Sequence, residues 1–191
     1  MRKIILLTMA FVLVAAASAN AAELKIGLFN MGEVALDCDA FKDAQKKIQS
    51  TYGNEQKALE NKEKDLQKKF EDFSVQQAGL SAEARQDRQV ELMRLKRDHD
   101  DKKNDFMRKV TAAENKSREE ITRVILIATA EYGKRNKYSL ILDANSAGAI
   151  HVEPSMDVTA DILKEANKVW KEKPKALTDG RPITTGKPRG N

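Results

Sequence analysis

The densest group of possible metal ligands in the chain is Asp98, His99, Asp100 and Asp101, four consecutive residues. Carboxylate and imidazole groups together are a ligand set that divalent transition metals accept. On a helix, however, neighbouring side chains fan out by about 100° per residue and do not face one another. The only other histidine, His151, has no ligand-like spacing to this group. We therefore predict no metal site.

Three other positions resemble reactive sites but lack partners. Asp143 follows a strand-like segment, where catalytic carboxylates often lie, and we interpret it as a turn residue that accepts backbone hydrogen bonds. Cys38, the only cysteine, has no histidine base near it in sequence. A histidine that the fold brings close to it in space stays an alternative. It is interpreted as a small packed residue, with an intermolecular bridge as the alternative. Thr185-Gly186-Lys187 lacks the strand and helix of a phosphate loop. The sequence thus predicts no catalytic residues, no cofactor and no enzyme.

The element that dominates the chain is a charged, proline-free stretch, residues 40–137. Its apolar residues begin with a nearly heptad-spaced stripe, which is typical of a helix packed against another helix. From Phe41 to Gln77 such a helix would extend roughly 55 Å. The stripe comprises Phe41, Ala44, Ile48, Tyr52, Leu59, Leu66, Phe70 and Phe73.

A reversal is predicted at Gly79 and Ser81, because glycine favours helix ends and serine favours helix starts. The return helix, residues 82–136, would be the longer one, at roughly 80 Å. Its residues 121–128 are apolar almost all round, which indicates burial in the head. Farther out, His99 and Lys102 interrupt its inner stripe. We therefore expect a flexible arm whose tip opens at low cost.

The flanking segments predict a small head. Strands are expected at 25–30, 138–143 and 149–152, followed by an amphipathic helix that starts near Asp157 or Thr159. Three short strands leave open edges, so we predict that identical copies associate to close them. The head comprises residues 22–39 and 138–172 with 121–137 packed in. The residues predicted to form the core of the head and of the trimer contact are Ile26, Leu28, Ile121, Val124, Ile125, Leu140, Leu142 and Ile150.

Both ends of the chain differ in character from the rest. Residues 1–21 have a basic start, a short apolar core and small residues at Ala19 and Ala21, so they predict a signal peptide cleaved near Ala21 and an exported protein. Residues 173–191 contain three prolines and three glycines with an excess of basic residues, and we predict a disordered basic tail.

The charge is unevenly distributed. Residues 40–137 carry 23 basic and 18 acidic side chains, residues 173–191 carry five and one, and the rest of the mature chain carries four and ten. A basic arm on an acidic head favours anionic partners reached by the arm, with a merely solvated helix face as the alternative. Export argues against nucleic acid as the biological partner. The candidate contacts for anions are Arg94, Arg97, Lys102, Lys103, Arg108 and Lys109.

Apolar side chains are also scattered among the charges of the arm. Some must pack inside the hairpin, whereas others would be partly exposed. Sparse, adaptable apolar groups suit weak binding of many unfolded chains. The candidate contacts of this kind are Phe70, Phe73, Val75, Leu80, Val90, Met93, Phe106 and Met107.

Two end motifs give the chain a family resemblance. KIGLFNMG at residues 25–32 and YSLILDANSAG…DVTADIL at residues 138–163, in this order around a long charged hairpin, resemble the Skp/OmpH family of periplasmic chaperones for outer-membrane proteins. The resemblance implies an α+β, mostly α fold, with long antiparallel hairpin arms on a β head completed by trimerisation, like a jellyfish. It also implies an ATP-independent holdase that encloses unfolded outer-membrane proteins. Lipopolysaccharide or anionic phospholipid is implied as a further partner.

The alternative function is a non-enzymatic coiled-coil adaptor of the cell envelope. An adaptor would need a continuous apolar seam and one stable folded partner. The interruption at His99 and Lys102 argues against that seam.

Overall fold

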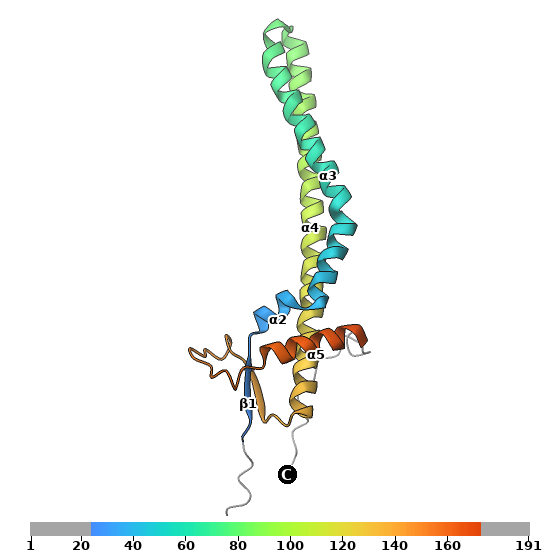
Figure 1. The fold of residues 1–191 in the computed structure, drawn as a ribbon. Helices are drawn as coiled ribbons and strands as arrows, with labels where there is room; N and C mark the ends of the chain where they lie inside the picture. The colour runs from blue at the N-terminus through green and yellow to red at the C-terminus, as the bar shows by residue number, and fades with distance from the viewer. Residues whose placement is uncertain (1–23, 173–191) are drawn as a thin grey trace, which may run out of the picture.

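A long two-helix arm stands on a small head in the computed structural model, which describes residues 24–172 (Figure 1). The predicted signal peptide and basic tail lie outside the described residues. The mostly helical α+β class predicted from the sequence is confirmed. In chain order the elements are β1 (Ile26–Phe29), α2 (Met31–Asp37), α3 (Asp39–Gln76), the 3₁₀ turn η1 (Gln77–Gly79), α4 (Ala82–Arg135), β2 (Leu140–Asp143) and α5 (Thr159–Glu172).

The arm consists of α3 and α4, which run antiparallel and side by side (Figure 1). The reversal lies where it was predicted, since α4 begins after Ser81, whose side chain accepts a hydrogen bond from the Ala84 amide. Leu66 of α3 and Leu92 of α4 are buried in the seam between the helices. Nearer the head, the rings of Tyr52 and Phe106 meet edge to face at 6.3 Å. This packing holds the two helices in one register along the arm.

The core of the head lies where α5 crosses the lower part of α4 (Figure 1). The apolar run of α4 predicted to be buried is buried, except for Leu126, which is 43% exposed. Helix α5 presents an apolar stripe to it, as its sequence pattern predicted. Together they bury Ile121, Val124, Ile125, Ile127 and Ala128 of α4 and Ile162, Ala166 and Val169 of α5. The longer return helix therefore serves both arm and head.

The sheet of the described chain has two parallel strands, with Ile26 paired to Leu140 and Leu28 paired to Leu142. The prediction of a third strand at 149–152 is wrong, because that segment is irregular. The second edge of β1 is instead occupied by a later segment. The Leu28 amide donates to the Met156 carbonyl and the Val158 amide donates to the Leu28 carbonyl, both at 2.8 Å.

Polar links fasten α5 to both arm helices. Arg135, at the end of α4, forms two hydrogen bonds to the buried carboxylate of Glu165, at 3.0 and 2.5 Å. Near the start of α3, the Asp39 amide donates to the Asn167 side chain. A tilt of the arm against the head would break these contacts. Within residues 24–172, no helix combines the length and apolar character needed to cross a membrane.

Candidate binding surface

Four of the apolar residues predicted to contact unfolded chains lie on the surface of the arm. Val75 is 79% exposed, Val90 61%, Met93 52% and Met107 55%. They belong to two helices whose surface is mainly charged or amide-bearing. Val90 and Met93 lie three residues apart on α4 and therefore share one face, whereas Val75 and Met107 lie away from them. Sparse exposed apolar groups suit extended segments that bind weakly at several places.

The other four predicted contacts are less accessible. Phe70, Phe73 and Leu80 are half-buried, as is Phe106. Phe106 packs edge-on against Tyr52, so in the closed arm its ring belongs to the seam. Access to these residues would increase if the helices separated.

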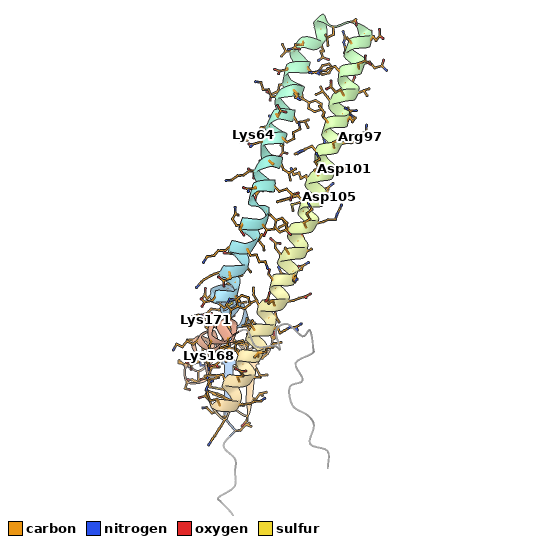
Figure 2. The ribbon with its side chains drawn as sticks, turned by 90° about the vertical axis from the view of Figure 1, so that its right-hand side faces the viewer. Lys64, Arg97, Asp101, Asp105, Lys168 and Lys171 are labelled. Atoms are coloured by element: carbon orange, nitrogen blue, oxygen red, sulfur yellow. The ribbon has the colours of Figure 1, made fainter. Side chains whose placement is uncertain are left out.

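The predicted basic contacts divide into paired and unpaired groups. Lys103 donates to Glu63 at 3.2 Å and Lys109 donates to Glu55 at 3.0 Å, both across the hairpin. Arg108 pairs with Asp105 on its own helix. Arg94, Arg97 and Lys102 form no ion pair within the described residues. Figure 2 shows Arg97 at the outer edge of α4, away from Lys64 on α3.

An apolar groove lies at the foot of the arm, where α2, α3 and α4 meet. Its volume is about 630 Å³. Leu36, at its edge, is 61% exposed. The groove was not predicted from the sequence, because it depends on how α2 packs against the helix pair. The only sequence signal was Leu36 itself, an apolar residue in a short helix. The apolar lining includes Ala35, Leu36, Phe41, Ala44, Ile48 and Ile121.

The residues predicted to form the head core lie at different depths. Ile121, Val124 and Ile125 are buried, and Ile26 and Leu28 are half-buried. Three others lie on the surface of the single chain and are not part of its core: Leu140 is 45% exposed, Leu142 38% and Ile150 102%. The first two lie on β2, which pairs with β1 on one edge only among the described residues. The single chain therefore leaves apolar surface beside an open sheet edge.

Asp143 closes a turn, as its position in the sequence suggested. Its carboxylate accepts hydrogen bonds from the Met31 amide at 3.1 Å and from the amide and hydroxyl of Ser146. Burial works to raise the pKa of Asp143, but these hydrogen bonds outweigh it and hold the pKa below its ordinary value. The group joins the end of β2 to the start of α2.

The remaining reactive residues are separated in the structure. Burial raises the pKa of the Cys38 thiol, which disfavours the reactive thiolate, and the sulfur donates to the Ala35 carbonyl. His151 is exposed in a loop of the head. His99 is buried in the arm, whereas Asp98 and Asp101 beside it are exposed, so this group does not converge on one point. The features of the described residues that could bind a partner are therefore the exposed apolar and basic side chains of the arm and the groove at its foot.

Comparison with known proteins gives consistent results. Residues 25–165 match the model of a family described as outer membrane protein (OmpH-like). The curated chaperone protein Skp of Yersinia enterocolitica is 24% identical over 150 residues, which cover 78% of this chain and 90% of that protein. A crystal structure described as a candidate OmpH-like outer membrane chaperone from Caulobacter crescentus has a TM-score of 0.63 at 13% identity. The match covers 78% of this chain and 87% of that chain.

Proposed function

This chain belongs to the OmpH-like family, and on that premise we propose that it is a periplasmic chaperone for unfolded outer-membrane proteins. It binds them between helical arms and prevents their aggregation without ATP. The name of the Yersinia relative supports the chaperone role. The predicted signal peptide supports the location.

The observation that carries this proposal is the form of the arm. Two helices project from the head and display a few exposed apolar side chains, among them Val75, Val90 and Met93, on a mainly polar surface. Each contact with an unfolded chain would be weak. Several arms acting on one client would raise the overall affinity without any new kind of contact.

Several arms require several copies, and we propose a homotrimer. The sheet of one chain has two strands of four residues each, which is too small to be stable alone. Exposed Leu140 and Leu142 beside the open edge of β2 would be covered by a second copy. A closed ring of identical subunits would place the arms around a shared space.

We further propose that the arm contacts anionic lipid, either lipopolysaccharide or phospholipid. Arg94, Arg97 and Lys102 support this because they are exposed and form no ion pair within the described residues. The arm as a whole also carries more basic than acidic side chains. Such contacts would weaken as the salt concentration increases.

The direct test is suppression of aggregation. An outer-membrane barrel protein is diluted from urea with and without the mature protein, and light scattering is followed. Scattering should fall to a minimum near one trimer per client, without ATP. Unchanged scattering would contradict the proposal. Capture of one folded partner at fixed stoichiometry, with no effect on scattering, would favour a structural adaptor instead.

A further inference from the structure

The arm has two broad flanks, one on each side of the plane through α3 and α4. Figure 2 shows Lys64 and Arg97 on the outer edges of the two helices. One flank carries the groove of about 630 Å³ at the foot of the arm, whose wall includes Gln45 and Glu114. We call this side the groove flank. The opposite flank carries a separate hollow whose wall includes Lys47.

On α3, the groove flank is rich in amide side chains. Steps of four and seven residues return a helix to nearly the same side. From the groove toward the tip, such steps give Gln45, Gln49, Gln56, Glu63 and Gln67. Gln56 and Gln67 each donate to a glutamate four residues on, at 2.9 and 3.1 Å, which leaves their amide oxygens as acceptors. A side chain at Gly53 would meet the Gln49 amide nitrogen at 2.7 Å, so this glycine makes room for that amide.

On α4, the groove flank carries two exposed methionines. The row through Glu114 returns every seven residues toward the tip, at Met107, Asp100 and Met93. Met107 is 55% exposed and Met93 52%. Arg118 lies one turn beyond Glu114 in the groove wall and is opposite to it in charge. Apolar contact points therefore continue from the groove along this side of the arm.

The lysines of the groove flank are held in ion pairs. Lys96 pairs with Asp100 at 2.7 Å along α4. Lys103 pairs with Glu63 at 3.2 Å across the hairpin. An uncharged segment could therefore lie along this flank without covering an unpaired lysine.

The opposite flank is lysine-rich on both helices. Its rows carry Lys47, Lys62, Lys69, Lys102, Lys109 and Lys116. Of these, Lys47, Lys102 and Lys116 are exposed and form no ion pair within residues 24–172. A neutral segment placed there would cover ammonium groups and remove their water, which costs free energy.

We propose that the groove flank is the face of the arm that holds an extended, uncharged segment of an unfolded chain. One apolar side chain of the segment enters the groove, and others contact Met107 and Met93, since methionine adapts to different apolar shapes. Glutamine amides both donate and accept, so they can pair with the free N–H and C=O groups of an extended backbone. The inference rests on the proposed function and adds to it the binding face and the class of segment.

The length of the flank fits one strand of a membrane barrel. From Met93 to Glu114 the row extends roughly 32 Å. An extended chain rises about 3.3 Å per residue, so about ten residues cover that length. A strand that crosses a membrane has about 9–11 residues, with apolar and polar side chains in alternation. Its apolar side would face the methionines and the groove.

The test is photo-crosslinking with the full mature protein. The photoreactive residue p-benzoylphenylalanine replaces Gln49 or Gln67 on the groove flank, or Lys47 or Lys69 on the opposite flank, one position at a time. The members of each pair, Gln49 with Lys47 and Gln67 with Lys69, lie within one turn of α3, so they differ in flank and hardly in height. Each variant is mixed with an outer-membrane barrel protein diluted from urea and is then illuminated. The groove-flank positions should crosslink the client several-fold more than their controls, and mass spectrometry should locate the crosslinks in uncharged strand segments of the client.

Equal crosslinking from the two flanks, or crosslinks mainly in charged segments of the client, would overturn the proposal. Crosslinks from the Gln49 position to a second copy of this chain, with no client present, would also overturn it, because the groove would then be a subunit contact. Light scattering of the same mixtures separates the two levels of the account. Suppressed aggregation with crosslinks on the wrong flank counts against this proposal alone, whereas a parent protein that suppresses no aggregation overturns the proposed function and this inference with it.

Discussion

Neighbouring side chains of the head differ sharply in how deeply they are buried within one chain. Ile125 and Leu126 are neighbours on α4, yet Ile125 has no exposed surface and Leu126 is 43% exposed. Two polar groups, Asp143 and Glu165, join segments far apart in sequence through hydrogen bonds that favour their charged forms. The effects of this burial and hydrogen bonding on the free energy of unfolding can be measured with single substitutions.

The first prediction compares the two neighbours. Ile125→Ala should destabilise the protein by about 3 kcal/mol, because it removes buried methyl groups and leaves a cavity. Leu126→Ala should cost much less, since part of that side chain already contacts solvent in the single chain. Denaturant unfolding followed by circular dichroism at 222 nm measures both. Equal losses for the two variants would mean that α4 does not enter the head in this orientation.

The second prediction concerns pH. The pKa of Asp143 lies below its ordinary value, so its charged form stabilises the fold above the unfolded value of about 3.9. This contribution is lost as the pH falls through the folded value. Asp143→Asn should lower the unfolding midpoint at pH 7 and flatten its decline between pH 5 and pH 3. Asp98→Asn, which alters an exposed carboxylate of the arm, should leave the profile unchanged.

At the scale of the elements, the sequence predicted the helices better than the sheet. The end of α3 and the start of α4 follow from local signals at Gly79 and Ser81. Burial of the apolar residues within 121–128 follows from their composition. The failed strand at 149–152 has a physical cause. Strand formation needs a neighbour, and β1 pairs with Met156 and Val158 instead, which the β-forming character of residues 149–152 could not reveal.

The candidate binding surface could be predicted from the sequence only in part. The sequence identified Val75, Val90, Met93 and Met107 as candidates but could not separate them from Phe106, because their exposure depends on the register between the two helices. It identified His99 as a break in the seam but not as a buried one. Burial at a single level of the hairpin depends on the opposing helix.

The third prediction tests the exposed apolar points of the arm. Replacing Val90, Met93 and Met107 together by serine should weaken suppression of client aggregation several-fold. It should change the stability of the arm little, since exposed substitutions usually cost within about 0.5 kcal/mol each. Light scattering and thermal unfolding measure the two effects. Gln89→Ser, a polar exposed change on the same helix, is the control, and full activity of the triple variant would show that clients bind elsewhere.

At the scale of the whole molecule, one chain leaves part of its head uncovered. Its arm is a finished hairpin, but its head presents a two-stranded sheet with an open edge and exposed apolar side chains on β2. The buried core holds α4 and α5 together without covering that edge. The parts left open on the head are those that a ring of copies would use.

The fourth prediction follows from that surface. Leu140→Arg with Leu142→Arg should prevent association, because charged side chains at an apolar contact remain unpaired when buried. The variant should keep the helical content of the arm, since both leucines lie on β2 in the head and are partly exposed. Sedimentation velocity should then give the mass of one chain. A variant that still associates fully would place the subunit contact away from β2.

The proposed function requires that identical chains associate through their heads and leave their paired helices free to hold a client. Multi-angle light scattering on the processed protein, eluting from a gel-filtration column, measures the number of chains directly. We expect the mass of three chains across the peak at micromolar concentration. A stable mass of one chain under those conditions would contradict it.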